Sequence, residues 1–436
     1  MAGEGQRTLG LNLRPFLGYR GTAMNPIPSP CMPPADDRAL SGLRVLDFTI
    51  MLAGPYCARL LADLGADVVK IESPEGDDMR LRQPLRPDAA GQRHSSYFGQ
   101  LNAGKRSLSL DLKQPEAIEL VKRLVLQADV LLENFRPGVM DRLGLGADAL
   151  RALNPRLVYA SISGYGQSGP AAGQPAYAMI VQAASGYEST LARYAGDRAR
   201  PAPTATFVAD VMGGIYACSA IQTALVQRAR TGIGQRVDVA LMDCMLNLLV
   251  YELQEAQFPV PGPRATYGPV ATADGDVMVV PISARNFEAL RDVTGLASLR
   301  DDPRFATQSL RNAHWAEMLQ ATEAWTRTRP RAEVLATLEA AGVPCAPYNE
   351  PRDALHDPQL HPHLQQRGVF SPLDDAAGAF TGVNPPWQLS ASPSGRSGHV
   401  PAVGEHTNAV LRELLQLDDA SLQALRTRGV FGRAEG

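Results

Sequence analysis

The sequence has few cysteines, no long apolar run and little net charge, and each shortage excludes a class of protein. Its five cysteines are widely spaced, with no CxxC pair or His-rich cluster, so we expect a reduced, cytoplasmic protein without a structural metal. No continuous apolar run approaches the roughly 18 residues of a membrane span. The 42 basic and 45 acidic side chains give a formal net charge of −3, which favours neither nucleic acid nor an anionic membrane as a partner.

The chain also lacks a Walker A motif, and its glycine fingerprint is a lookalike. Residues Gly164-Tyr-Gly-Gln-Ser-Gly169 match G-x-G-x-x-G after an expected strand. A dinucleotide site, however, needs a helix to open within the motif. Pro170, Gly173 and Pro175 follow and exclude that helix, so we do not expect a nicotinamide site.

Length and composition predict a globular protein of two domains. A chain of 436 residues exceeds what one hydrophobic core usually organises. Residues 1–40 carry Gly, Pro and Arg without periodicity, and we expect this N-terminal extension to be disordered or loosely attached. A Pro/Gly cluster at 259–263 indicates a linker. We therefore predict a large domain from residues 41–258 plus 351–436 and a small domain at 265–350.

Strands alternate with helices from residue 43 onward, which predicts an α/β fold with a doubly wound parallel sheet. In the large domain we expect strands at 43–49, 66–72, 107–112, 128–134, 157–162 and 234–241. We expect helices there at 56–64, opened by Pro55 as first helical residue, and at 115–126, 139–143, 147–153 and 242–257, the last long and strongly apolar. Further along we expect a strand at 277–282, a helix from 286, helices at 315–325 and 331–341, β-like pieces at 368–372 and 380–383, and helices at 405–417 and 420–428.

Ligands bind beyond the carboxyl ends of the strands in such sheets, and the loops 49–55, 134–138 and 163–170 leave those ends. The second loop places Arg136 and Arg142 near a helix start. These arginines suit an anionic group such as phosphate, or they lie on a solvated helix face; the pattern alone does not separate the two.

A single carboxylate, Asp210, stands between small residues and an apolar run that extends from Val211 to Leu225. This pattern predicts a helix that begins at Val211 with Asp210 as its N-cap. The field of the helix N-terminus would lower the pKa of the carboxyl group and keep it ionised. Such a carboxylate is either a plain helix cap or, with space for a ligand beside it, a nucleophile.

An ordered series of motifs covers almost all of residues 43–417. The stretches are 43–49 with 52–55, 60–72, 102–107, 133–138, 163–170, 208–214, 272–275, 342–345 and 404–407. Together they resemble the class III CoA-transferases of the CaiB/BaiF type, the family of formyl-CoA transferase, carnitine CoA-transferase and the α-methylacyl-CoA racemases. This resemblance implies a Rossmann-like large domain, a smaller α/β domain and an interlocked homodimer.

The resemblance also implies a catalytic role for Asp210. In the family mechanism this carboxylate attacks the donor acyl-CoA and forms a mixed anhydride, the CoA thiolate returns to form an aspartyl-CoA thioester, and an incoming acid takes the CoA. Succinyl-CoA is a candidate donor, and a small carboxylic or dicarboxylic acid is the expected acceptor. Acyl-CoA is then a substrate, and we expect no tightly bound cofactor and no metal.

Seven CoA-binding positions carry over by the same resemblance. They are Ala53, Leu110, Lys113, Asn134, Phe135, Val139 and Arg142. The cations of Lys113 and Arg142 would offset phosphate charge, and the apolar members would line the path of adenine and pantetheine.

Departures from the family pattern bear on the substrate. Leu52 stands where the formyl-CoA and carnitine enzymes use a glutamine, and Ile50 also replaces a polar position, which argues against formate/oxalate exchange. Tyr177-Ala178 stand near the position where the racemases carry a His-Asp pair. A racemase is therefore the less favoured alternative, because neither residue is an effective base at neutral pH. A CoA-binding protein without turnover is a third alternative, but it would have no need of Asp210.

Overall fold

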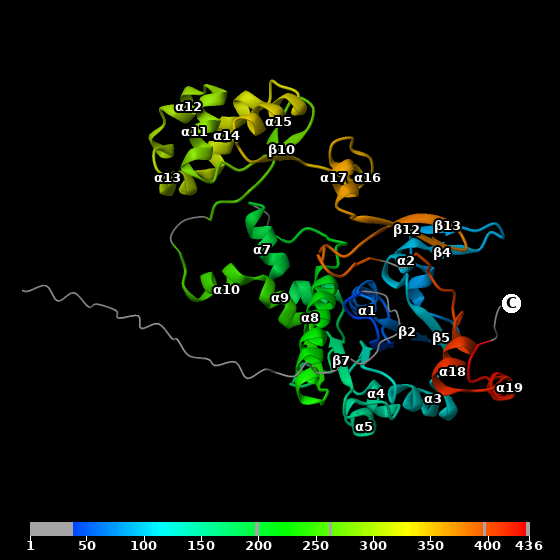
Figure 1. Cartoon of the computed structure of the whole chain (residues 1–436). Coiled ribbons are helices and arrows are strands. Elements are labelled where there is room, and N and C mark those ends of the chain that lie inside the picture. Colours follow the sequence, from blue (N-terminus) through cyan, green and yellow to red (C-terminus); the bar gives the residue numbers. More distant parts are fainter. Residues whose placement is uncertain (1–37, 197–199, 261–263, 396–397, 433–436) are drawn as a thin grey trace, which may run out of the picture. The chain divides into compact units, whose positions relative to one another are not determined.

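Six short apolar strands pair into one parallel sheet (Figure 1). The computed structural model describes residues 38–196, 200–260, 264–395 and 398–432. The strands are β1 (Arg44–Asp47), β2 (Asp67–Glu72), β5 (Arg106–Ser109), β6 (Val130–Glu133), β7 (Val158–Ser163) and β8 (Arg236–Ala240), in the spatial order β5-β2-β1-β6-β7-β8. The prediction of a parallel α/β sheet is confirmed, and each strand lies within or overlaps its expected range.

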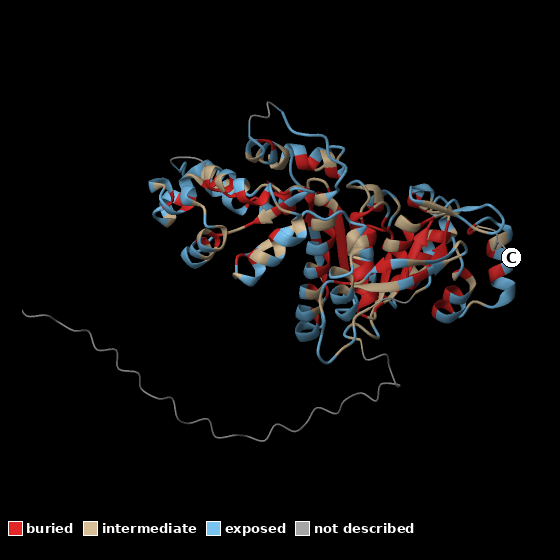
Figure 2. Cartoon of the chain, turned by 90° about the horizontal axis from the view of Figure 1, so that it is seen from above, coloured by how far each residue is buried: buried red, intermediate tan, exposed pale blue. Residues whose placement is uncertain are grey.

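Helices cover both faces of this sheet because successive side chains of a strand point to opposite faces. Leu46 belongs to one apolar cluster and its neighbour Val45 to the other. The first cluster contains α3 (Pro115–Val125), α5 (Ala147–Leu153), α18 (Thr407–Leu415) and α19 (Asp419–Thr427). The second contains α1 (Ala53–Asp63), α6 (Ala178–Ala184), α8 (Val208–Thr231) and α9 (Leu241–Leu248). Figure 2 shows buried residues concentrated on the strands and on the inner sides of these helices.

The strand order changes direction between β1 and β6. From β1 the chain adds β2 and β5 on one side, and then crosses to β6, β7 and β8 on the other. Such a switch point opens a crevice at the carboxyl ends of the two strands, where ligands of α/β proteins bind. The segments that follow the two strands at this crevice are residues 49–52 after β1 and residues 134–138 after β6.

Two expected helices differ from the prediction, and a third, α8, is described with the candidate site. The long helix 242–257 is wrong as a single element, because it is broken at Leu249 into α9 and α10 (Val250–Gln257). Pro55 is the third residue of α1 and not the first. By contrast, the exclusion of a helix after Gly164 is confirmed, because the next helix, α6, begins only at Ala178.

Several elements had no clear signal in the sequence. In the first part of the chain they are η1 (Asp78–Leu81), the hairpin β3 (Leu85–Pro87)–β4 (Arg93–Ser95), α2 (Ser96–Asn102) and α7 (Tyr187–Tyr194), while the short α4 (Val139–Arg142) was expected. Later ones are α12 (Ala297–Arg300), η2 (Pro303–Phe305), α13 (Gln308–Ala313), α16 (Asp353–His356) and α17 (Leu360–Gln366).

A second, antiparallel sheet has its own apolar cluster within the range expected for the small domain. It consists of β9 (Val270–Ala271), β10 (Asp276–Val279) and β11 (Cys345–Pro347), with α11 (Ala284–Thr294), α14 (Trp315–Thr326) and α15 (Arg331–Ala340). The hairpin β12 (Phe370–Asp375)–β13 (Gly378–Val383) follows. The domain boundaries stay a prediction, and residues 1–37 of the expected extension lie outside the described residues. Leu40, within that extension, packs against the second cluster of the large sheet.

By length and composition, α8 could cross a membrane. It has 24 residues and a mean hydropathy of 1.2 over its most apolar window. It packs against α1, β7 and β8, and 39% of that window is buried. Length and composition alone therefore do not exclude α8 as a membrane-spanning segment, whereas its contacts with the sheet and α1 are those of a helix packed within the protein.

Gly214 lets α8 approach the backbone of α1, and the two helices lie side by side in Figure 1. A Cβ atom at Gly214 would stand 2.7 Å from the carbonyl oxygen of Ala53 and 2.9 Å from the ring of Tyr56. The first contact is with the main chain, which cannot move aside as a flexible side chain can.

We therefore expect Gly214→Ala to lower the free energy of unfolding by about 1–3 kcal/mol, because overpacking displaces one helix from the other. Gly173→Ala is the matched control, since a Cβ there meets nothing within 4 Å. Urea unfolding of the two variants and the wild type measures the difference. Equal midpoints for Gly214→Ala and wild type would contradict this account of the helix contact.

Candidate active site

Asp210 lies in the first turn of α8, as its third residue, and does not cap the helix. The helix begins at Val208, and its N-cap residue Phe207 offers no side-chain hydrogen bond. Instead the side-chain oxygen of Gln182, on α6, accepts a hydrogen bond of 3.2 Å from the backbone N–H of Ala209. The expected start at Val211 with Asp210 as N-cap is therefore wrong. A side chain from another helix accepts the hydrogen bond at the N-terminus of α8, and the carboxylate of Asp210 does not act as the cap.

The expected direction of the pKa shift is also wrong. Burial raises the pKa of Asp210 to about 6. Among the residues that the structure describes, no ion pair or hydrogen bond of this carboxyl group offsets the loss of water. At neutral pH the group is still mostly ionised, as a half-buried carboxylate without a counter-ion among these residues.

The packing of α8 places Asp210 beside the start of α1. Gly214, which meets the carbonyl oxygen of Ala53, is four residues after Asp210 and so lies about one helical turn further along the same face. The next residue, Val211, packs in a cluster with Met51 and Leu52, from the loop before α1. The carboxylate therefore stands next to the loop that follows β1, at the switch point of the sheet.

Tyr97 is a site residue that the sequence analysis missed. It lies in α2 and belongs to the same cluster as Met51 and Val211. Burial raises the pKa of its phenol, and the nearby charge of Asp210 raises it further. The short stretch around Tyr97 has no periodicity or motif that could have indicated this, because α2 reaches Asp210 only through the tertiary fold. Tyr97, Met51, Leu52 and Val211 belong to one apolar cluster beside the first turn of α8, and we call these four residues the acyl chamber.

Asn134 fastens the loop of the acyl chamber to the neighbouring strand. Its side-chain oxygen accepts from the N–H of Ile50 at 2.9 Å, and its amide nitrogen donates to the carbonyl oxygen of Ile50 at 2.8 Å. The next residue, Met51, has a φ of 64°, which is rare for a residue with a side chain. The two hydrogen bonds from Asn134 hold Ile50, the residue directly before this unfavourable conformation, in place.

The structure places the expected CoA-binding residues along one edge of the sheet, and these assignments stay predictions. Ala53 is buried at the start of α1, while Lys113 and Arg142 are exposed, before α3 and at the end of α4. Phe135 and Val139 are half-buried between them. Leu110 is fully buried in the first apolar cluster, and its backbone N–H donates to the carbonyl oxygen of Glu72, so the structure gives this residue no surface for a ligand.

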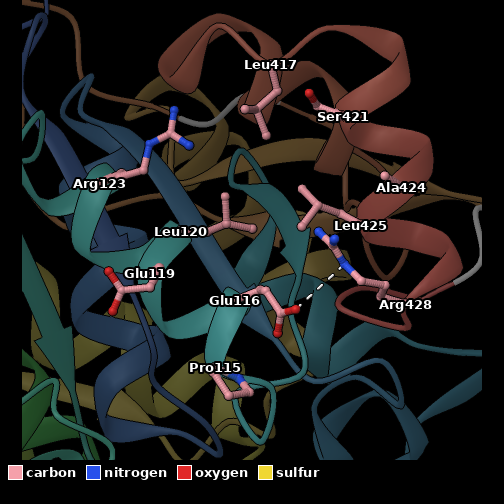
Figure 3. Close-up of a pocket in the computed structure, with 10 residues that line it drawn as sticks. All are labelled: Pro115, Glu116, Glu119, Leu120, Arg123, Leu417, Ser421, Ala424, Leu425 and Arg428. Carbon is pink, nitrogen blue, oxygen red and sulfur yellow. Dashed lines mark ion pairs between the residues drawn. The ribbon is translucent and has the colours of Figure 1, made fainter.

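A pocket of about 550 Å³ lies between α3 and α19 (Figure 3). Leu120, Leu417 and Leu425 lie on its apolar sides, and the ion pair of Glu116 with Arg428, 3.6 Å between charged atoms, crosses one end. Its lining includes neither Asp210 nor any expected CoA-binding residue. It is therefore separate from the candidate active site.

Comparison with known proteins identifies the family and the fold of the chain. A family model described as CoA-transferase family III matches residues 40–407. The succinate–glutarate CoA-transferase of Agrobacterium fabrum is 38% identical over 388 residues, which cover 86% of this chain and 95% of that protein. The formyl-CoA:oxalate CoA-transferase of Streptomyces avermitilis is 36% identical over 419 residues, or 90% of this chain and 100% of that protein. The crystal structure of a CaiB/BaiF family protein from Brucella suis superposes with a TM-score of 0.75 at 36% identity, covering 87% of this chain and 100% of that one.

The raised pKa of Asp210 predicts a stability difference with a defined pH dependence. Below about pH 4 the carboxyl group is neutral in both the folded and the unfolded chain. Between pH 4 and 6 the unfolded chain ionises first, so the wild type loses stability as the pH rises. The side chain of Asp210→Asn does not ionise. At pH 8 we therefore expect the free energy of unfolding of this variant to exceed that of the wild type by up to about 3 kcal/mol, seen as a higher urea midpoint.

The control for this measurement is Asp292→Asn, an exposed carboxylate on α11 whose loss should change stability little at either pH. Urea unfolding at pH 4.5 and pH 8 tests the prediction. A gain of the same size at both pH values would show that the effect does not come from ionisation of Asp210.

Proposed function

The chain belongs to family III of the CoA-transferases and is a CoA-transferase, and we propose that it moves CoA from an acyl-CoA to a small carboxylic or dicarboxylic acid through covalent intermediates on Asp210. The observation that carries the proposal is a half-buried carboxylate at the carboxyl edge of the sheet, whose pKa is raised and which has no counter-ion among the described residues. Removal from water strengthens a carboxylate as a nucleophile because no hydration shell has to be displaced during attack.

Four exchanges at Asp210 complete the reaction without ATP. The carboxylate attacks the thioester carbonyl of the donor, the C–S bond breaks, and a mixed anhydride and the CoA thiolate form. The thiolate attacks the aspartyl carbonyl and releases the donor acid, leaving an aspartyl-CoA thioester. The acceptor carboxylate then attacks this thioester and expels the thiolate. Finally the thiolate attacks the acyl carbonyl of the new anhydride, which yields the acceptor's CoA thioester and restores Asp210.

The basic residues support CoA binding on the same edge of the sheet. Lys113 and Arg142 are exposed and free of the apolar core, as expected for groups that meet phosphates. Ala53 lies beside the main chain of Gly214 and so close to Asp210. We propose that the phosphates bind at the two cations and that the thioester reaches Asp210 past Ala53.

The nature of the acyl chamber bears on the acids exchanged. Met51, Leu52 and Val211 give it apolar walls, and Tyr97 is its hydroxyl-bearing member. Relatives at 33–38% identity include a succinate–glutarate CoA-transferase and a succinyl-CoA–L-malate CoA-transferase subunit. We propose succinyl-CoA as a donor and a small carboxylic or dicarboxylic acid as the acceptor.

Racemisation of an α-methylacyl-CoA is supported less well. That reaction needs a second acid/base group besides Asp210. Tyr177 is 64% exposed and Ala178 carries no titratable group. Tyr97 is close to Asp210, but its raised pKa makes it a poor base at neutral pH.

We propose that two copies of the chain form a homodimer through α8, α9 and α10. Apolar side chains are exposed along these helices: Ile215, Tyr216, Leu248, Val250, Tyr251 and Leu253, each between 36% and 72% accessible. Val250 is the most exposed of them. An apolar surface of this kind usually marks a protein interface.

For catalysis, we expect Asp210→Asn to lose CoA transfer by at least about 10³-fold, because an amide cannot form the anhydride. Binding of CoA should persist, and isothermal titration measures it. Wild-type enzyme mixed with succinyl-CoA and then hydroxylamine should carry a hydroxamate at Asp210, detected by peptide mass spectrometry. Full activity of the variant, or an unmodified Asp210 peptide in an active enzyme, would refute the nucleophile.

For assembly, light scattering should give twice the chain mass of 46.7 kDa. Val250→Asp should shift the mass toward the monomer, because a charge would be buried in the apolar interface. Val226→Asp changes an exposed apolar residue near the C-terminal end of α8. If its mass stays that of the dimer, the interface does not reach this end of the helix. A wild-type monomer at micromolar concentration would contradict the proposal.

A further inference from the structure

Lys105 is a buried cation whose three hydrogen bonds join β1, the first turn of α1 and α2. Its Nζ donates to Asp47 Oδ2 at 2.9 Å, to Asn102 Oδ1 at 2.8 Å and to the carbonyl oxygen of Pro55 at 3.1 Å. The side chain has no solvent-accessible surface. The bond to Pro55 reaches the first turn of α1, directly after the loop that carries Met51 and Leu52.

Lys70 makes a second attachment to the same segment. Its Nζ donates to the carbonyl oxygen of Thr49 at 2.7 Å and to Asp77 Oδ2 at 3.1 Å, again with no exposed side-chain surface. Asp47 joins the two lysines, because its Oδ1 accepts from the N–H of Thr49 at 2.9 Å and its Oδ2 is bound to Lys105. Residues 49–55 are thus bound at both ends by main-chain atoms and, through Asn134, at Ile50.

We propose that Lys105 and Lys70 are positioning residues, which hold the 49–55 segment in its strained conformation so that the acyl group meets Asp210 in line for attack. The inference rests on the proposed role of Asp210. It goes further, because it assigns a function in catalysis to two buried lysines that touch neither substrate nor nucleophile.

Energetics favour this role over a purely structural one. Burying ammonium groups is expensive, and a well-packed apolar core would usually be at least as stable as a buried ion pair. The cations here do what apolar side chains cannot: they bind main-chain carbonyl oxygens at the two ends of a segment that contains a residue with φ of 64°. A small shift of this segment would move Ala53 and Leu52 relative to Asp210, and misplacement of about 1 Å costs about 10²-fold in rate.

The charge on Lys105 gives the proposal a signature. Burial lowers the pKa of Lys105 to about 8; Asp47 and Asp77 oppose the shift, and Lys70 adds to it. Cys57 on α1 also faces this lysine. The neutral amine has two N–H groups for three acceptors, so one attachment is lost on deprotonation. Lys70 keeps its charge, because burial is outweighed by Asp47, Asp77 and Glu72, which raise its pKa.

The test is the pH dependence of kcat from pH 5 to 9.5, measured at saturating succinyl-CoA and acceptor. We expect an alkaline limb near pH 8, with kcat falling about eightfold between pH 7.5 and 9 if only the protonated form is active. In Lys105→Arg the charge persists above pH 12, so kcat should stay flat up to pH 9.5. Lys122→Arg, on the exposed face of α3, is the matched control and should keep the wild-type limb.

Thermal melting at each pH separates local loosening from unfolding. A wild type without an alkaline limb, a limb that persists in Lys105→Arg, or a limb that coincides with loss of folded protein would overturn the proposal. If Lys105→Arg does not fold, the double variant Asp47→Asn with Lys105→Met removes both charges together; it should fold, show kcat at least tenfold below wild type and lack the limb. Wild-type kcat in that variant would also overturn it.

Failure of this proposal is distinguishable from failure of the proposed function. Because Asp210 must be ionised to attack, the same profile should also show an acid limb near pH 6. This acid limb and the hydroxylamine adduct report Asp210, whereas the alkaline limb and its response to Lys105→Arg report the positioning lysines. An enzyme with the adduct but no alkaline limb would retain Asp210 as its nucleophile, and only the positioning role of Lys105 and Lys70 would be contradicted.

Discussion

The approach of α8 to the backbone of α1 is the contact on which the candidate site depends. It is possible because Gly214 has no side chain, and the nearest atom of α1 is the carbonyl oxygen of Ala53. One turn earlier on α8, this contact brings Asp210 to the loop that follows β1. The site is therefore a product of helix packing on one face of the sheet, with the strands supplying a fixed crevice below it.

Two aspartates near this crevice, Asp47 fully buried and Asp210 half-buried, show how the surroundings of a carboxyl group set its pKa. For Asp47, burial would raise the pKa, but Lys105 and Lys70 outweigh it and the pKa is lowered. For Asp210, burial is unopposed and the pKa is raised. The carboxylate of Asp47 accepts hydrogen bonds from Thr49 and Lys105 and so holds the loop after β1 in place. The second, Asp210, has no hydrogen bond among the described residues and is the carboxylate that we propose as the nucleophile. Enzymes with paired carboxylates use the same separation of environments.

Much of the fold could be predicted because local patterns and the sheet agree. The strands around Val45 and Leu131 read as buried β-structure with helices between them, which is sufficient for a parallel sheet and its binding edge. The errors lie where a distant residue decides. Asp210 looks like an N-cap in sequence, but Gln182 from another helix binds the N-terminus of α8. The break at Leu249 leaves the apolar pattern of the helix intact, so nothing in the periodicity reveals it.

The same limit applies to the candidate site. Asp210 and the loop residues could be found from motifs because they stand in recognisable stretches. Tyr97 could not, since only the folding of α2 onto the chamber brings it there. The predicted role of Asn134 illustrates a further limit: the residue is at the right edge of the sheet, but the structure shows its amide bound to Ile50, a connection that no spacing in the sequence expresses.

The loop after β1 is fastened almost entirely through its main chain, at Thr49, Ile50 and Pro55, and this separates its shape from its side chains. Met51 and Leu52 can therefore be exchanged for other residues during evolution without loosening a single one of those bonds. With the proposed role of the chamber in contacting the acid, a few substitutions there would change the acid accepted, while the hydrogen bonds that hold the loop are kept. Such an arrangement makes the acquisition of new substrates a matter of point mutation rather than of refolding.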